Sequence, residues 1–95
     1  MPAYIIAEID VTNPAGYESY RPLAGASVAQ YGGKFVVRGG GASELVEGDA
    51  APQRVVIIEF ADKAAAKRWY NSPEYQAALK VRLANSTGRV VLVEG

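Results

Sequence analysis

Three short segments of this chain are so rich in Val and Ile that a β-strand in each would be apolar on both of its faces. They read AYIIAEIDV at residues 3–11, RVVIIEF at 54–60 and RVVLV at 89–93. Side chains alternate across a sheet, so neighbours such as Ile57 and Ile58 point to opposite sides. A sheet made from these strands has to be covered on both faces, which restricts the folds open to the chain.

The first helix is expected directly after the first strand. Asn13 is a good N-cap and Pro14 suits the first helical position. Apolar residues then recur at three- and four-residue steps as far as Tyr31. Pro22 removes a backbone hydrogen bond and is expected to kink or split this helix. A pair of glycines ends it, and a second strand, KFVVRG, follows at 34–39.

A glycine-rich connection leads from the second strand to the third. It reaches residue 52, and a short extended piece is expected within it at 44–46. After the third strand, Asp62 and Ser72 are two separate helix starts, so two consecutive helical segments are expected. Gly88 is expected to break the second of them before the last strand begins.

The predicted order of elements is β-α-β-β-α-β, the split pattern of ferredoxin-like folds. Right-handed crossovers put both helical regions on the same side of a four-stranded antiparallel sheet, with the spatial strand order 4-1-3-2. A chain of 95 residues has the size of one domain. Residues 1–95 are therefore expected to form a single α+β domain.

Helices on one side leave the other face of this sheet uncovered. Each apolar side chain gains roughly 1.5–3 kcal/mol when fully buried, so the uncovered set gives on the order of 10–20 kcal/mol. Association costs about 4–15 kcal/mol, and we therefore expect a two-fold symmetric homodimer with its sheets packed face to face. The uncovered set comprises Tyr4, Ile6, Val36, Val55, Ile57, Val91 and Val93.

The chain lacks both histidine and cysteine. This removes Ser-His-Asp and Cys-His catalysis and the usual zinc ligands, and neither a metal nor a cofactor is expected. Lys and Arg total 10, as do Asp and Glu, a balance that argues against a nucleic-acid or anionic-membrane partner. A cytoplasmic location is expected, because the N-terminus has no signal-peptide core and no apolar run reaches the length of a membrane span.

Several strings of the sequence resemble one known family. They are AYIIAEIDVTNPAGYESYRPL, YGGKFVVRGG, RVVIIEF, WYNSPEYQAALKVR and GRVVLVEG. Together they cover nearly the whole chain and resemble the domain-of-unknown-function 1330 family, which is similar to the dimeric α/β-barrel superfamily. The resemblance implies ferredoxin-like protomers that dimerise through their sheets. Wider relatives include antibiotic-biosynthesis monooxygenases, muconolactone isomerases and ligand-sensing domains, but the family has no established activity, so the resemblance implies no reaction.

Four charged residues interrupt the uncovered face and are the first candidates for a site. With the first and third strands as parallel neighbours, Glu8 and Glu59 would lie near the same end of the sheet. Arg89 would then lie beside Glu8, and Lys34 beside Glu59. Two carboxylates in a partly apolar site could act as acid or base. The alternative is that the two cations neutralise them at the rim.

Arg38 and the aromatic residues are the remaining candidates. Arg38 is expected at the other end of the same face, near Tyr4, where it could bind a carboxylate ligand or pair with an acid of a second protomer. The aromatic residues on the helices could form a pocket for a flat organic ligand. The alternative is that they fill the core between helices and sheet. The aromatic candidates are Tyr17, Tyr20, Trp69 and Tyr70.

Three functions stay open at this point. The first is a homodimer that binds a small organic molecule in a cavity between sheet and helices or between sheets. The second is a cofactor-independent monooxygenase- or isomerase-like enzyme for a small cyclic substrate, which rests on analogy together with Glu8, Glu59 and Arg38. The third is a structural or interaction module, which a dimer interior without a cavity would favour. No catalytic residue is assigned.

Overall fold

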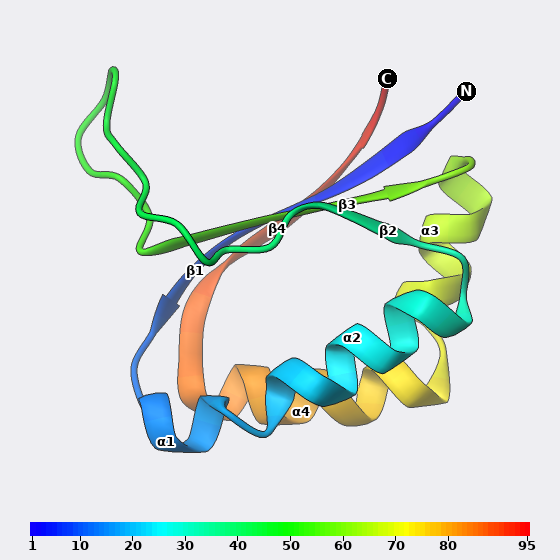
Figure 1. The fold of residues 1–95 in the computed structure, drawn as a ribbon, viewed down its shortest axis with the longest axis horizontal. Helices are drawn as coiled ribbons and strands as arrows, with labels where there is room; N and C mark the ends of the chain where they lie inside the picture. The colour runs from blue at the N-terminus through cyan, green and yellow to red at the C-terminus, as the bar shows by residue number, and fades with distance from the viewer.

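The backbone forms a four-stranded sheet with all four helices on one of its faces (Figure 1). The computed structural model describes residues 1–95. The strands are β1 (Ala3–Val11), β2 (Lys34–Val37), β3 (Arg54–Phe60) and β4 (Ser86–Glu94). The helices are α1 (Pro14–Tyr17), α2 (Tyr20–Gln30), α3 (Lys63–Tyr70) and α4 (Pro73–Asn85). The expected β-α-β-β-α-β order is confirmed, with each helical region divided in two.

The sheet has the order β2-β3-β1-β4, and every neighbouring pair is antiparallel. The expected spatial order is confirmed, but the expected parallel pairing of the first and third strands is wrong. The helical crossover makes β1 parallel to β2, and β3, which lies between them, runs in the opposite direction to both. As a result, Tyr4 lies opposite Glu59, and Glu8 lies opposite Val55.

Three of the four helices begin at the side-chain caps that the sequence predicts. Asn13, Asp62 and Ser72 each accept a hydrogen bond from the backbone N–H three residues later, at 3.4, 2.8 and 3.1 Å. Such a cap stabilises a helix by about 1 kcal/mol. These caps fix the first residues of α1, α3 and α4.

The first helical region is split as expected. α1 ends at Tyr17 and α2 begins at Tyr20, so Pro22 lies in the first turn of α2. A backbone N–H in the first turn has no partner within the helix, so the proline interrupts no hydrogen bond there. None of the helices has the length and apolar character that spanning a bilayer requires, and the cytoplasmic location stays a prediction.

Strand lengths differ from the sequence-based expectation. β2 stops at Val37, and residues 44–46 form no strand. β4 begins at Ser86, so Gly88 lies inside a strand, and the prediction that it breaks a helix is wrong. Its φ is +151°, and a Cβ there would overlap the carbonyl oxygen of Glu8. Glycine at this position permits the close pairing of β4 with β1.

The core lies between the helices and the sheet, and its centre is aromatic. Trp69 is 2% exposed, and its ring centroid lies 4.1 Å from that of Tyr75 and 5.5 Å from that of Phe60. The indole N–H of Trp69 donates to Ser27 Oγ at 3.0 Å. Aromatic side chains of the helices therefore pack against the sheet, as one of the two interpretations of the sequence expected.

The opposite face of the sheet carries no helix. Val36, Val91 and Val93 on this face remain 54%, 41% and 40% exposed, and Ile57 is half-buried. We refer to this surface as the open face. Its apolar character agrees with the alternation that the strand sequences predict.

Candidate functional site

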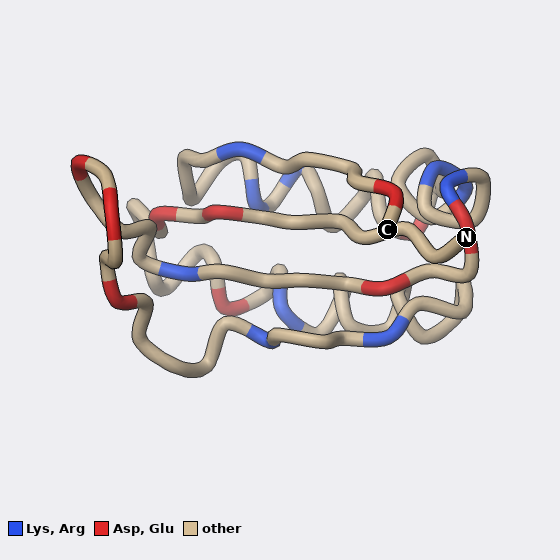
Figure 2. The backbone as a smooth tube through the Cα atoms, turned by 90° about the horizontal axis from the view of Figure 1, so that it is seen from above, with Lys and Arg blue, Asp and Glu red and all other residues tan.

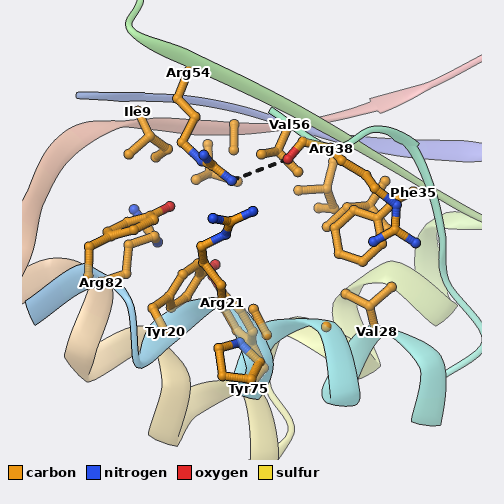
Figure 3. Close-up of a pocket in the computed structure, with 18 of the residues that line it drawn as sticks. Ile9, Tyr20, Arg21, Val28, Phe35, Arg38, Arg54, Val56, Tyr75 and Arg82 are labelled. Atoms are coloured by element: carbon orange, nitrogen blue, oxygen red, sulfur yellow. Dashed lines mark hydrogen bonds between the residues drawn. The ribbon is translucent and has the colours of Figure 1, made fainter. Parts of the chain in front are cut away.

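A pocket of about 400 Å³ lies between the sheet and the helices (Figure 3). Of the 20 residues that line it, 13 are hydrophobic. Ile9 and Val56 come from the sheet, whereas Val28 comes from α2. The volume falls in the range of sites for small organic molecules. The pocket is therefore on the helix-covered side of the sheet and not on the open face.

Four arginines from separate parts of the chain line this pocket. Arg21 comes from α2, Arg38 follows β2, Arg54 begins β3 and Arg82 lies on α4. Against these four guanidinium groups stands one lining carboxylate, that of Glu18. The chain contains as many acidic as basic residues, so this is a local concentration of positive charge.

None of these four arginines has a carboxylate partner. The one ion pair of the chain joins Arg89 Nε to Glu8 Oε1, at 3.1 Å on the open face. Buried or half-buried arginines are ordinarily paired with an acid or fully hydrogen-bonded. Their positive charges are therefore available to an anion that enters the pocket.

Arg82 is the deepest of the four. It is 6% exposed, and its Nε is buried without a hydrogen-bond partner. Burial acts to lower the pKa of Arg82, but the phenol groups of Tyr75 and Tyr20 outweigh it and hold that pKa above its ordinary value. The guanidinium therefore stays charged, and it carries a donor that no protein group accepts.

Tyr20 and Tyr75 form a pair of hydroxyl groups beside Arg82. Their phenol oxygens lie 2.9 Å apart, and the Tyr75 ring is buried in the core. Burial, reinforced by the neighbouring Tyr75, raises the pKa of Tyr20 well above its ordinary value. Both residues line the pocket, and because one hydroxyl donates to the other, the pair keeps one O–H that can donate to a ligand.

Arg54 reaches into the pocket from the sheet. Its Nη1 and Nη2 donate to the carbonyl oxygens of Gly39 and Arg38, each at 3.2 Å. Its guanidinium carbon lies 5.6 Å from the centre of the Tyr17 ring, within reach of a cation–π interaction. The Nε of Arg54 is buried and has no partner, so this group too has an unused donor.

The glycine after Arg38 makes this arrangement possible. Gly39 has a φ of +80°, and a Cβ there would lie 3.0 Å from the Cγ of Arg54. The positive φ favours glycine at this position, and the absence of a Cβ lets the backbone at residue 39 lie close against the Arg54 side chain. This gives the VRGG string of the sequence a role in shaping the pocket.

Arg21 and Arg38 are the exposed members of the cluster. In Figure 3, Arg21 rises from the helices toward Arg54, which descends from the sheet. Arg38 lies on the far side of the pocket from Arg82, and its guanidinium carbon is 4.7 Å from the centre of the Phe35 ring. The cationic groups thus extend from the buried interior to the rim.

The aromatic candidates divide between the pocket and the core. Tyr17, Tyr20 and Trp69 line the pocket. Tyr70 does not, and its ring packs 5.5 Å from that of Tyr75 and 6.2 Å from that of Trp69. Three of the four aromatic candidates are therefore brought together in one place.

The charged candidates on the open face do not form the expected cluster. Glu8 and Glu59 lie at opposite ends of the sheet, because β1 and β3 are antiparallel. Figure 2 shows the acidic stretches of these two strands toward opposite ends. Lys34 lies opposite Glu59, and Arg89 lies opposite Glu8, as expected. Two separate pairs of opposite charges replace the predicted pair of carboxylates.

Arg38 also lies elsewhere than expected. The prediction placed it on the open face near Tyr4, whereas it lines the pocket on the opposite side. The pairing of β2 with β3 shifts between Phe35 and Val37, and such an irregularity reverses the alternation of the side chains that follow. Tyr4 pairs with Glu59, at the other end of β3 from Arg38.

Sequence reasoning did not identify three of the pocket arginines. Arg54 shares its face of the strand with Val56 and Ile58, a pattern that places its side chain toward the helices. Arg82 follows Tyr75 and Ala78 at helical spacing, on the buried face of α4. Both signals are present in the sequence. Arg21 carries no comparable signal, because it stands in an exposed first turn.

Fold and pocket together define a ferredoxin-like α+β protein with a cationic cavity between its two layers. The model of the family described as Domain of unknown function (DUF1330) matches residues 2–95. The chain belongs to that family, and the resemblance seen in the sequence is confirmed. No curated protein matches the sequence at a significant level.

Solved structures of several proteins are similar to this one. A protein of unknown function from Rhodopseudomonas palustris has a TM-score of 0.80 at 22% identity, with 99% of this chain and 82% of that chain covered. SnoaB, a cofactor-independent oxygenase from Streptomyces nogalater, has a TM-score of 0.70 at 25% identity, covering 99% and 92%. A dimeric ferredoxin-like protein of unknown function from Jannaschia sp. CCS1 has a TM-score of 0.69 at 19% identity, covering 100% of both chains.

Proposed function

We propose that this protein binds a small organic anion in the pocket between its sheet and its helices. The carrying observation is the cluster of four pocket arginines, none of them paired with a carboxylate. Arginine presents its donors in a planar fork that matches a carboxylate. Arg82 as a residue is 6% exposed, and its positive charge has no carboxylate partner to compensate for the hydration that burial removes. A bound carboxylate supplies that compensation.

The remaining lining defines the rest of the ligand. Most of the wall is hydrophobic, and the Trp69 and Tyr17 rings add flat surfaces for an apolar or aromatic body. Within the hydrogen-bonded pair of Tyr20 and Tyr75, the hydroxyl that does not donate to the other can donate to a ligand oxygen next to Arg82. The ligand class is therefore a carboxylic acid with an apolar, preferably aromatic, body. Such a cavity argues against a purely structural module.

Thermal shift and calorimetric titration with benzoate, 1-naphthoate and salicylate test this function. A ligand at about 100 times its Kd stabilises the folded state by about 2.7 kcal/mol, which raises Tm by about 10–20 °C for a domain of this size. Arg82→Met and the milder Arg82→Lys are expected to weaken the effect. Arg68→Met, on an exposed arginine of α3 outside the pocket, is the matched control. Absence of stabilisation by every carboxylate tested would count against an anion site.

We also propose that the chain forms a homodimer through its open face. The apolar, exposed side chains of Val36, Val91 and Val93 support this. The similar proteins from Jannaschia and from Bacteroides fragilis are both described as dimeric. In this arrangement the arginine pocket lies on the outer side of each sheet, so the two sites act independently. Light scattering at micromolar concentration tests the proposal, and a monomer mass would overturn it.

A second candidate function is cofactor-independent oxygenation, which the likeness to SnoaB supports. A cationic pocket favours the anion of an acidic substrate, which is the form that gives up electrons to O2. Glu18 is the one carboxylate in the lining and the candidate acceptor of the substrate proton. One oxygen atom would replace two hydrogens of the substrate, and the other would leave as water, so no further reductant is needed.

Oxygen uptake with anthrone, whose CH2 group is acidic, tests this second candidate. Uptake that depends on Glu18 would be lost in Glu18→Gln and retained in Glu47→Gln, a substitution in the exposed loop. Glu8 and Glu59, which the sequence suggested for acid–base chemistry, lie on the open face and outside the pocket lining. A rate of oxygen uptake no higher with the protein than in buffer alone would contradict the oxygenase function and leave ligand binding as the proposed function.

A further inference from the structure

We infer that the ligand carries two acidic groups, one at each end of an apolar body, and that the pocket selects a dicarboxylate over a monocarboxylate. This inference rests on the proposed anion-binding function. It follows from how the four pocket arginines are distributed in depth. A single carboxylate engages one or two guanidinium groups and would leave the others of this cluster without a counter-charge.

The deep end of the pocket supplies one acid site. Arg82 is 6% exposed, and its buried Nε lacks a partner. Arg54 is half-buried and also has a buried Nε without a partner, although its two terminal nitrogens are occupied by backbone carbonyls. Both side chains line the pocket, and neither has a carboxylate partner. Together with the one hydroxyl proton that the Tyr20–Tyr75 pair leaves free beside Arg82, they are suited to one carboxylate away from solvent.

The rim of the pocket supplies the other acid site. Arg21 and Arg38 are both exposed and both line the pocket. Figure 3 shows Arg38 across the pocket from Arg82, with Arg21 between them and pointing inward from the helices. Neither guanidinium is paired with an acid of the chain. A second carboxylate at the rim would pair with these cations while remaining partly solvated.

Apolar surface separates the two ends. Ile9, Phe35 and Val56 of the sheet and Val28 of α2 are drawn around the interior in Figure 3. An inorganic dianion such as phosphate would leave this surface uncovered and could reach only one of the two ends. A dicarboxylate with a hydrocarbon or aromatic spacer covers the apolar wall and meets both groups of arginines.

The contribution of the rim to this selectivity can be measured with matched ligand pairs. Terephthalate and isophthalate each have a monoamide, 4- and 3-carbamoylbenzoate, of nearly the same size and with one charge fewer. We expect calorimetric titration to show that at least one of the two diacids binds about tenfold more tightly than its monoamide. The reason is that the diacid can form one more charge-assisted hydrogen bond with an arginine than the monoamide can. Arg21 and Arg38 are both exposed, so we expect Arg21→Gln and Arg38→Gln to leave the fold unchanged, and each is expected to reduce this ratio to about twofold or less.

The deep end has a different expected signature. Arg82→Lys should weaken the diacid and its monoamide by the same factor, because both place a carboxylate there. Arg68→Gln, outside the pocket, should leave both affinities unchanged. Equal affinity of each diacid and its monoamide in the unsubstituted protein would overturn the two-acid inference while leaving the anion site in place. Failure of all four compounds and of the monocarboxylates to bind would overturn the proposed function itself.

Discussion

The phenol oxygens of Tyr20 and Tyr75 lie 2.9 Å apart, although 55 positions separate the two residues in the sequence. Tyr20 opens α2 and Tyr75 lies in the first turn of α4. Their contact joins the two helical regions at the pocket and leaves one hydroxyl proton free to donate beside Arg82, which has no carboxylate partner. The pair therefore belongs both to the stability of the fold and to the proposed anion site.

Removing either hydroxyl of this pair should reduce both stability and ligand affinity. Tyr20→Phe or Tyr75→Phe is expected to lower the free energy of unfolding by about 0.5–1.5 kcal/mol, the net value of one hydrogen bond. The double variant should lose less than the sum of the two, because either single change removes the same contact. Urea denaturation measures these values. Fully additive losses would show that the hydroxyls do not interact.

The buried indole N–H of Trp69 depends on Ser27. Ser27 is 1% exposed, accepts from Trp69 at 3.0 Å and donates to the carbonyl of Ala24 at 2.8 Å. Ser27→Ala leaves the indole donor buried without a partner, so we expect a loss of about 1–3 kcal/mol in the free energy of unfolding. Ser19→Ala, at an exposed hydroxyl, is the control. A loss at Ser27 no larger than at Ser19 would contradict this account of the core.

Two adjacent glycines should respond differently to alanine. Gly39 has a φ of +80° and no room beside Arg54, whereas nothing lies within 4 Å of a Cβ built at Gly40. Gly39→Ala is expected to cost about 1 kcal/mol or more in stability and to weaken carboxylate binding, because it displaces Arg54. Gly40→Ala should change neither quantity appreciably. Denaturation and calorimetric titration of both variants test the pair, and equal effects would contradict the role given to Gly39.

The hydrogen bond between Tyr31 and Glu74 gives the stability a dependence on pH at both extremes. The helix backbone and then the Tyr31 hydroxyl, 2.8 Å away, hold the pKa of Glu74 below its ordinary value of 4.5. This contribution is present above pH 4.5 and is lost as the pH falls through the lowered pKa. The same bond raises the pKa of Tyr31 above 10.0, so its contribution is present below pH 10 and is lost as the pH rises further.

Glu74→Gln should flatten the acid limb of this dependence. Thermal unfolding measured from about pH 6 down to about pH 3 is expected to show a shallower decline than in the unsubstituted protein. Glu47→Gln, in the exposed loop between β2 and β3, serves as the control. An unchanged slope in Glu74→Gln would show that Glu74 contributes nothing to acid sensitivity.

A charge on the open face should separate the protomers of the proposed dimer. Val91 is 41% exposed on the open face, and Leu83 is 63% exposed on the outer side of α4. Val91→Glu would bury a carboxylate from each protomer in the proposed interface, so we expect it to shift the mass in light scattering from dimer to monomer. Leu83→Glu should remain dimeric. Dissociation by Leu83→Glu instead would place the interface on the helices.

Regular local signals made most of the fold predictable. The helix starts were predictable because Asn, Asp and Ser are favoured N-cap residues, and they stand at positions 13, 62 and 72. The alternation of side chains in β3 likewise assigns Ile57 and Ile58 to opposite faces of the sheet. The predicted parallel direction of β1 and β3 was wrong because it is fixed by the connections and not by any residue in either strand. The helical crossover makes β2 parallel to β1, and β3 runs back beside β2, so β3 is antiparallel to β1. Because of that error, Glu8 and Glu59 were predicted to lie near the same end of the sheet, whereas in the structure they lie at opposite ends.

The pocket was only partly predictable for a related reason. Tyr17, Tyr20 and Trp69 were identified because aromatic residues at helical spacing stand out in a sequence. Arg54 and Arg82 occupy core-facing positions where an arginine contradicts the surrounding pattern, and that contradiction is the signal for a functional residue. Arg38 requires the irregularity in β2 to reach the pocket, and the pairing of β2 with β3 reveals it.

Nitrogen-15 NMR of the arginine Nε–H groups tests the central claim most directly, because the chain contains six arginines divided between pocket and surface. Titration with benzoate and with terephthalate should shift the Nε–H resonances of Arg54 and Arg82 first, because both guanidinium groups belong to residues that line the pocket and neither has a carboxylate partner. Arg68 and Arg89 should not respond. Shifts confined to Arg68 or Arg89, or no shift at any arginine, would contradict an anion site between the sheet and the helices.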